Sequence, residues 1–335
     1  MIIPIFIGAC QPEPIANLGD LPTRVIIPTE SLTPSNTPTD TPTPMATPSA
    51  THTATVTVTA SATITNTPLF TETPTSTITA TASIMPIQIS PLPPTPAPNL
   101  IASELPTVFG YGQSVEGRTL TAHRVGNGAL VMMLVGGIHG GYEANTITLI
   151  DQFIIHFQNN PLDVLPNITF ILVPSANPDG ATYGRSLAGR FNANGVDLNR
   201  NWDCDWSEEA YFRDSPVYAG EKPFSEPESV ALAALINDIR PAVVLFYHSA
   251  ANGIYAGDCA GGGVSAPMTE ILGRATGYPY GVEFTDYVVN GTASSWVDSL
   301  GIPAADVELA SADLTEFSRN LDGVLALQCW LTMVC

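Results

Sequence analysis

The sequence predicts an α/β protein: a single three-layer α/β/α domain on a mixed, mostly parallel sheet, preceded by a disordered Thr/Pro-rich spacer. Two observations support this prediction. From residue 100 onward, short apolar runs alternate with longer segments in which apolar residues recur at helical spacing. Such alternation is typical of strands joined by helices that cover both faces of a sheet. Residues 28–98 are instead dominated by Thr, Pro, Ser and Ala.

The expected strands and helices follow from this pattern. The first apolar run ends in glycine and the second ends at Pro174, as buried strands do. One helix opens with a predicted capping box, in which Ser225 is the N-cap and Glu228 lies three residues later. We expect strands at Val131–Gly137, Asn167–Ser175, Ala242–His248 and Ile302–Leu309, and helices at Ala144–Phe157, from Ser225 to about Arg240, Pro267–Thr276 and Glu316–Leu331.

The Thr/Pro-rich segment divides the chain. It has too few large apolar side chains to offset the entropy of ordering its backbone, so we expect it to be disordered. The predicted divisions are a signal remnant with a lipobox at residues 1–10, a spacer at 11–99 and one globular domain at 100–335. The last is long enough to close a hydrophobic core.

The first ten residues, MIIPIFIGAC, are an apolar run that ends in small residues before Cys10. This resembles the lipobox of bacterial lipoproteins, in which the cysteine is acylated after signal cleavage. The run is too short for a transmembrane helix. We expect an extracellular or cell-surface protein that is anchored through a lipid on Cys10, with the spacer as a tether. A non-secreted chain with an apolar N-terminus is the alternative.

The charge balance excludes some partners. The formal net charge is −20, and Lys222 is the single lysine. A surface this acidic argues against binding nucleic acid and against binding anionic membranes by charge. We expect a monomer whose only membrane attachment is the lipid anchor.

Two of the five histidines, His139 and His248, each follow an apolar strand and precede small residues. Asn177 and Glu308 also lie at strand ends, where the sites of parallel sheets gather. His139 and Glu143 are four apart across a Gly-Gly turn, and zinc in hydrolytic sites often takes two histidines and one carboxylate. A loop histidine beside a carboxylate at a helix N-terminus is the alternative, and the pair alone does not decide between them.

The segment NPDGATYGRSLAGRFNANGVDLNRNW decides between these readings. It resembles the zinc carboxypeptidases of the carboxypeptidase A type, which show Asn-Pro-Asp-Gly after a strand, then an arginine, then Gly-Val-Asp-x-Asn-Arg-Asn. These fall here at Asn177–Gly180, Arg190 and Gly195–Asn201. Tyr111–Leu120 resembles the start of the family's domain. The resemblance therefore covers nearly the whole globular unit.

The resemblance implies one zinc ion per chain, bound by His139, Glu143 and His248. Asp197 would accept the second ring N–H of His139 and fix its tautomer. The family usually places the first His and Glu three apart, whereas the gap is four here. We expect the Gly-Gly pair to absorb the extra residue, because glycine reaches backbone angles that other residues avoid.

The resemblance also assigns roles to the residues around the metal. Glu308 would be the general base, and Arg190 would stabilise the developing oxyanion. Arg200 and Asn199 would bind the free carboxylate of the substrate, which makes the enzyme an exopeptidase. Tyr287 would be the mobile tyrosine that contacts the substrate.

The resemblance also suggests which residue forms the base of the specificity pocket. That position falls on Ser294, which predicts no strong preference for terminal Lys or Arg, although nearby Asp298 keeps that preference open.

Four cysteines remain after Cys10, and they allow three pairings. We favour Cys204–Cys259, because each follows a segment that we assign to the rim of the site, which leaves Cys329–Cys335.

The predicted function is zinc-dependent removal of C-terminal residues from peptides. A murein-derived peptide is a candidate substrate for a bacterial surface lipoprotein. Two alternatives stay open: a zinc deacylase that acts on N-acyl amino acids, and a non-catalytic binding module on the same fold.

Overall fold

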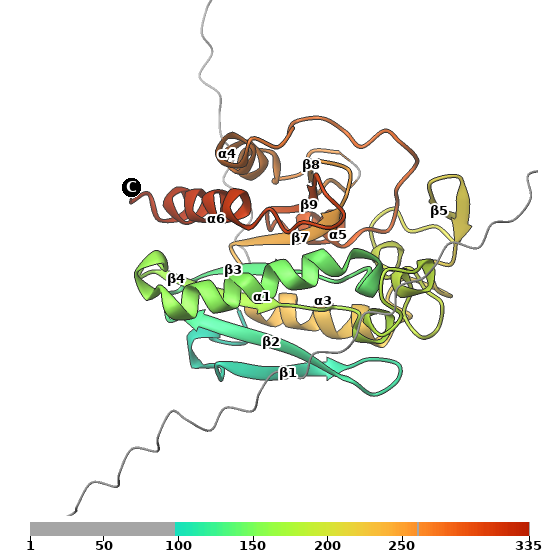
Figure 1. Ribbon diagram of the computed structural model, residues 1–335, viewed down its shortest axis with the longest axis horizontal. Coiled ribbons are helices and arrows are strands. Elements are labelled where there is room, and N and C mark those ends of the chain that lie inside the picture. The colour runs from blue at the N-terminus through green and yellow to red at the C-terminus, as the bar shows by residue number, and fades with distance from the viewer. Residues whose placement is uncertain (1–97, 260, 335) are drawn as a thin grey trace, which may run out of the picture. The chain divides into compact units, whose positions relative to one another are not determined.

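The computed structural model describes residues 98–259 and 261–334 (Figure 1). The predictions about the lipobox, the spacer and the partner of Cys329 involve residues outside this part of the chain. Seven strands form one sheet in the order β1-β2-β4-β3-β7-β9-β8. The strands are β1 (Val108–Gln113), β2 (Thr119–Gly126), β3 (Leu130–Val135), β4 (Ile168–Val173), β7 (Val243–Ser249), β8 (Gly253–Ala256) and β9 (Ala304–Leu309).

The centre of the sheet is parallel and its edges are antiparallel. β4, β3, β7 and β9 pair in parallel, whereas β1, β2 and β8 add antiparallel pairings. All six residues of β4 are buried, while β1 has no buried residue. A parallel strand covered on both faces is a nearly continuous apolar run, which is why the central strands could be predicted from the sequence. A separate hairpin joins β5 (Ala210–Phe212) to β6 (Ser215–Val217).

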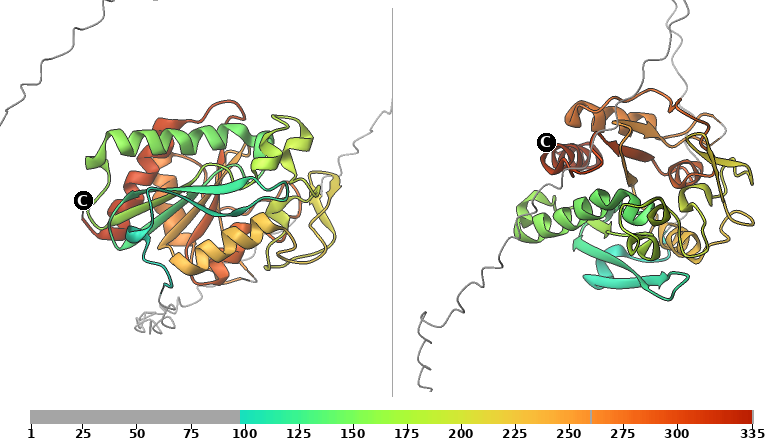
Figure 2. Two further views of the ribbon diagram at one scale, coloured as in Figure 1. Left: turned by 90° about the horizontal axis from the view of Figure 1, so that it is seen from below. Right: turned by 45° about the vertical axis from the view of Figure 1, so that its right-hand side comes forward.

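Helices cover both faces of the sheet, which confirms the predicted fold class (Figure 2). The helices are α1 (Ala144–Asn159), α2 (Pro178–Ala181), α3 (Pro227–Ile239), α4 (Ala266–Thr276), α5 (Ala293–Ser299) and α6 (Phe317–Thr332), with short 3₁₀ turns at Ala102–Glu104, Gly140–Glu143, Pro161–Asp163, Leu187–Arg190 and Leu198–Arg200. Alternate residues of β3 enter different cores, with Met133 packing on the side of α3 and α5 and Leu134 on the side of α1, α4 and α6. No helix in the described part of the chain is long and apolar enough to cross a membrane.

The predicted capping box at the start of α3 is wrong, although the helix itself is present. The helix begins at Pro227 with Glu226 as its N-cap residue and no side-chain cap. The Ser225 hydroxyl donates to the Glu226 carboxylate, and Glu228 accepts from the backbone N–H of Val115. Both members of the expected box are therefore engaged by other groups, and proline at the first helical position needs no partner for an N–H.

Candidate active site

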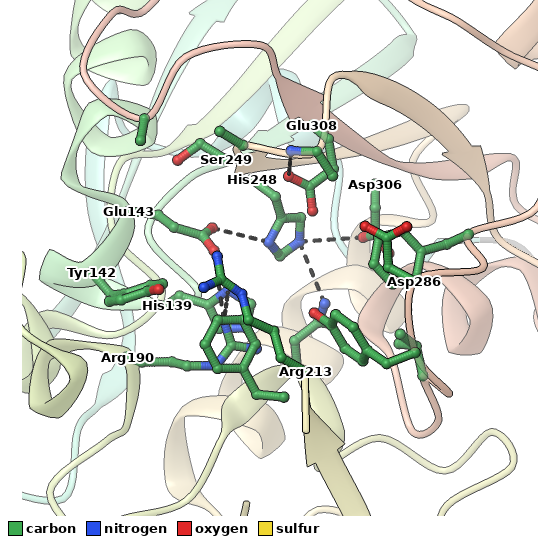
Figure 3. Close-up of a pocket in the computed structure, with 18 of the residues that line it drawn as sticks. His139, Tyr142, Glu143, Arg190, Arg213, His248, Ser249, Asp286, Asp306 and Glu308 are labelled. Carbon is green, nitrogen blue, oxygen red and sulfur yellow. Dashed lines mark hydrogen bonds and ion pairs between the residues drawn. The ribbon is translucent and has the colours of Figure 1, made fainter. Parts of the chain in front are cut away.

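Three buried side chains converge at the carboxyl end of the parallel strands (Figure 3). His139 follows β3, His248 is the penultimate residue of strand β7, and Glu143 ends the 3₁₀ turn that leads into α1. The Nδ1 atom of His139 lies 2.8 Å from one carboxylate oxygen of Glu143, and the Nδ1 atom of His248 lies 3.2 Å from the other. One ligand atom from each residue lies within 4.8 Å of the others.

Backbone packing explains how His139 and Glu143 meet despite their spacing. Gly140 has φ +42°, and a Cβ on Gly141 would lie 2.5 Å from the carbonyl oxygen of Gly184. The turn therefore packs against the 180–189 segment at a distance that excludes side chains. The two glycines allow the backbone to turn tightly enough to accommodate the additional residue between His139 and Glu143. The side chains of both residues therefore point to the same metal position.

Asp197 connects the first histidine to an arginine. Its Oδ1 lies 3.2 Å from Nε2 of His139, and its Oδ2 accepts from Nε of Arg190 at 2.8 Å. Burial alone would raise the pKa of Asp197, but Arg190 and His139 hold that pKa well below its usual range. The carboxylate therefore stays ionised and can accept the Nε2–H of His139. That arrangement leaves the Nδ1 lone pair of His139 directed at Glu143 and the metal position.

The second histidine has a carboxylate neighbour that sequence reasoning missed. Oδ1 of Asp306 lies 3.3 Å from Nε2 of His248, so each metal-site histidine faces an acid on its far side. Burial lowers the pKa of His248, but Asp306 and Glu143 outweigh it and raise that pKa well above the usual value. A signal was present, because Asp306 lies two residues before Glu308 on a strand and so shares its face.

Glu308 and the three residues of the metal cluster line the same cavity, which has a volume of about 460 Å³. One of its carboxylate oxygens accepts from the backbone N–H of Ala251 at 3.1 Å. Burial raises the pKa of Glu308 to about 7, with Glu143 adding to the shift and His248 opposing it. A carboxyl group with a pKa near neutrality is suited to take and return a proton at physiological pH.

Arg200 and Asn199 line the same cavity. Arg200 is 2% exposed, and its guanidinium donates to the carbonyl oxygens of Asn199 and Tyr211. No carboxylate of the described residues lies within ion-pair distance of it. Tyr287 also lines the cavity, and burial raises the pKa of its phenol. The structure thus brings all nine predicted site residues to one cavity or to the layer directly behind it.

The residues that we considered for specificity have other partners. Ser294 donates to Asp306 at 2.8 Å and lines a neighbouring hollow. Asp298 accepts from the backbone of Val264 and from the hydroxyl of Ser265, and it does not line the cavity. The carboxylate of Asp298 is therefore used in hydrogen bonds within the fold. The aspartates that line the cavity are Asp286 and Asp306.

The remaining sequence predictions have clear outcomes. The Cys204–Cys259 disulfide is present, as predicted. His156 pairs with Asp163 and does not line the cavity. The Cys329–Cys335 pairing involves Cys335, which lies outside the described residues.

Known proteins resemble this chain in sequence. Residues 101–259 match the family model described as zinc carboxypeptidase. Murein peptide amidase A of Vibrio campbellii is 31% identical over 240 residues, and the match covers 68% of this chain and 89% of that protein. The chain belongs to the zinc carboxypeptidase family. It is therefore a metallocarboxypeptidase-type hydrolase, and the His139, Glu143 and His248 group fits the family's zinc.

Two other similarities place this zinc carboxypeptidase among its relatives. Carboxypeptidase B of Astacus astacus is 35% identical over 144 residues, which covers 37% of this chain and about half (47%) of that protein. Among solved structures, the murein-tripeptide amidase of Escherichia coli O157 is 27% identical with a TM-score of 0.51, and the match covers 68% of this chain and 93% of that one.

Proposed function

We propose that this zinc carboxypeptidase removes the C-terminal residue of peptides that end in a free carboxylate. The observation that carries the proposal is Arg200, a buried guanidinium that lines the same cavity as the metal cluster and has no carboxylate partner among the described residues. A buried cation needs a counter-charge, and a terminal carboxylate of the substrate would provide it with charge-assisted hydrogen bonds. The side-chain oxygen of Asn199 accepts from the backbone N–H of Ala293 at 3.0 Å, which fixes the amide. Asn199 would bind the terminal carboxylate together with Arg200.

The other residues would then act around the scissile bond. Bound zinc supplies Lewis acidity, which polarises a carbonyl and makes water more acidic. Glu308 would accept a proton from the attacking water and pass it to the leaving amine. Arg190, whose Nη1 lies 3.3 Å from the ring of His139, would stabilise the negative charge that develops on the carbonyl oxygen. Tyr287 would close over the bound residue.

Peptides derived from murein are the substrate class that we favour. Two of the relatives described above are amidases that act on murein peptides by name. We also propose that the protein works outside the cytoplasm, anchored through Cys10, as a monomer. The Cys204–Cys259 disulfide supports this location, since such bonds persist in oxidising compartments.

The decisive experiment compares one peptide as its free acid and as its C-terminal amide. The amide leaves Arg200 without a counter-charge, so kcat/KM should fall by about 10- to 100-fold. Arg200→Ala should impair the free acid far more than the amide. Equal cleavage of the two forms, or products cut from the chain interior, would refute exopeptidase action. Faster turnover of an N-acyl amino acid would favour a deacylase, and zinc binding without turnover of either would favour a binding module.

A further inference from the structure

The guanidinium of Arg190 is held along its edges. Its Nε donates to Oδ2 of Asp197 at 2.8 Å, and its Nη2 lies 2.8 Å from the same oxygen. Its Nη1 lies 3.3 Å from Nδ1 of His139 and 3.7 Å from a carboxylate oxygen of Glu143. Such contacts leave the tilt of the guanidinium plane loosely defined, because hydrogen bonds tolerate a broad range of directions at the acceptor. A contact on the face of the guanidinium is needed to fix that tilt.

The ring of Phe212 provides a contact on this face. Phe212 is the last residue of β5, and the guanidinium carbon of Arg190 lies over its ring, 3.9 Å from the centroid. This distance is well inside the range of cation–π contacts. Arg213 also lies near the ring, at 5.1 Å, but Arg213 is exposed whereas Arg190 is buried. The contact with Arg190 is therefore the desolvated one, and cation–π contacts are stronger when desolvated.

Two tyrosines from separate segments hold the ring of Phe212. Tyr142 meets it edge to face, with 5.7 Å between the ring centroids and 86° between the planes. Tyr287 meets it in the same way, at 6.0 Å and 90°. Edge-to-face pairs at these separations are a favoured arrangement of aromatic rings. The ring that covers Arg190 is therefore itself fixed by packing.

Tyr142 connects this arrangement to the unusual spacing of the metal motif. It is one of three residues between His139 and Glu143, where the family usually has two. Its ring lines the cavity, and the guanidinium carbon of Arg190 lies 5.9 Å from the ring centroid. Tyr142 and Arg190 lie on the same side of the metal cluster (Figure 3). The longer motif thus places an aromatic ring beside Phe212 and Arg190.

The same hairpin contacts Arg200 in a different way. The carbonyl oxygen of Tyr211 accepts from Nη2 and Nε of Arg200, at 3.0 and 3.3 Å. This contact is made by the hairpin backbone, whereas Arg190 is contacted by a side chain. Replacing the side chain of Phe212 can therefore alter the surroundings of Arg190 and leave the hydrogen bonds of Arg200 in place.

We propose that Phe212 is a positioning residue for Arg190. Its ring fixes the plane of the guanidinium and keeps water from that face, so that Nη1 is directed at the reacting carbonyl oxygen. This inference rests on the proposed role of Arg190 in the reaction. A donor that is already oriented needs no rearrangement when negative charge develops on that oxygen. Because this charge exists only in the transition state, Phe212 should affect kcat and leave KM nearly unchanged.

The kinetic test compares two replacements of Phe212 in the zinc-loaded full chain, with one well-cleaved free-acid peptide. Phe212→Leu keeps an apolar side chain but removes the ring, whereas Phe212→Tyr keeps the ring. We expect Phe212→Leu to lower kcat by about 3- to 30-fold, the range expected for a desolvated cation–π contact, and to leave KM within about twofold. Phe212→Tyr should retain most of the wild-type kcat.

Phe317→Leu is the matched control. Phe317 is also half-buried, and its ring contacts Phe153 and His156 outside the cavity. This change removes a ring of the same size and should leave kcat unchanged. Thermal unfolding is measured for every variant, and Phe212→Met replaces Phe212→Leu if the latter does not fold.

A second measurement depends neither on turnover nor on zinc. Ten of the eleven basic residues are arginines, so the side-chain Nε–H signals in an NMR spectrum of the metal-free full chain are few. The signal of Arg190 is assigned by its loss in Arg190→Lys. A group over the face of an aromatic ring is shifted upfield, and this shift should disappear in Phe212→Leu and persist in Phe317→Leu.

Three results would each overturn the inference alone. These are a loss of kcat below about threefold in Phe212→Leu, equal losses in Phe212→Leu and Phe212→Tyr, and an Arg190 signal that does not change in Phe212→Leu. If the wild-type protein cleaves no free-acid peptide, the proposed function fails, and the positioning role fails with it. The Arg190 signal would then still report whether the ring contact exists, so the two failures can be told apart.

Discussion

His248 and Glu308 are register partners on the neighbouring parallel strands β7 and β9. Residues at matched positions of paired strands project from the same face of the sheet, so a metal ligand and the proposed base emerge side by side. The third strand-end residue, His139, follows β3, which pairs with β7 on its other side. Backbone hydrogen bonds of the sheet therefore set the spacing of the site.

The first prediction concerns Glu308→Gln. This change keeps the shape of the side chain and can keep the bond from Ala251, but it removes the proton acceptor. We expect a folded protein with normal zinc content and turnover lower by about 10²- to 10⁴-fold. Steady-state kinetics and metal analysis of the same preparation check both parts. Near-normal turnover would show that another group is the base.

The raised pKa of Glu308 predicts a pH effect on stability in the metal-free protein. Folding disfavours the ionised carboxylate, because the pKa of about 7 in the folded protein exceeds the ordinary glutamate pKa of 4.5. The resulting destabilisation of the folded protein is therefore fully present above pH 7, and it disappears as the pH falls below 4.5. Metal-free Glu308→Gln should be more stable than the wild-type protein by about 1–3 kcal/mol at pH 8, with the difference shrinking toward pH 4.5. Urea unfolding across this range gives the comparison, and a difference independent of pH would contradict it.

His248→Ala should bind little or no zinc, because only two of the three protein ligands of a catalytic zinc site would remain. His156→Ala is the matched control, since this histidine also pairs with a carboxylate but lies outside the cavity. We expect about one zinc per chain in the control, measured by metal analysis after dialysis. Wild-type zinc content in His248→Ala would remove this residue from the ligand set.

Asp197→Asn tests the layer behind the metal. The amide no longer carries the charge that pairs with Arg190, and it holds His139 less firmly. Losing a partner of this kind typically lowers metal affinity by about 10- to 100-fold. Arg190, which is buried, would keep only its longer contact with Glu143 at 3.7 Å, so the change should also destabilise the fold, by at most about 3–5 kcal/mol.

Asp163→Asn is the control for this change, because Asp163 also pairs with a histidine but its side chain is 42% exposed. A surface pair of this kind contributes at most about 1 kcal/mol. Zinc competition assays and urea unfolding on both variants separate the two effects. If the two variants behave alike, Asp197 is not needed to position His139.

The central fold was predictable because its signals are local. Each buried parallel strand is a short apolar run, and the site residues follow these runs directly. The edge strands β1, β2 and β8 were not predicted from periodicity, since their exposed residues need not be apolar. The error at Ser225 has a different cause. The competing partner of Glu228 is the backbone of Val115, which is distant in sequence.

The same limit applies to the site. Motif order was enough to place the metal-site residues, Glu308, Arg190 and Arg200 in one cavity. It did not indicate Asp306 as the neighbour of His248, because that contact depends on the pairing of β7 with β9. The spacing of Asp306 and Glu308 indicates that they share one face of a strand, but a single sequence carries no pattern that shows which residue of another strand lies beside them.

The strand-borne site has a consequence for how the protein acquires its metal. Glu143 and His248 are 105 positions apart, and they meet only when β3 and β7 have paired. Parallel pairing over such a distance closes long loops and is slow relative to local helix formation. A partly folded chain would hold only the adjacent His139 and Glu143, which are too few for tight capture. Zinc uptake would then mark the end of folding, and the bound ion would hold the chain in that state by mass action.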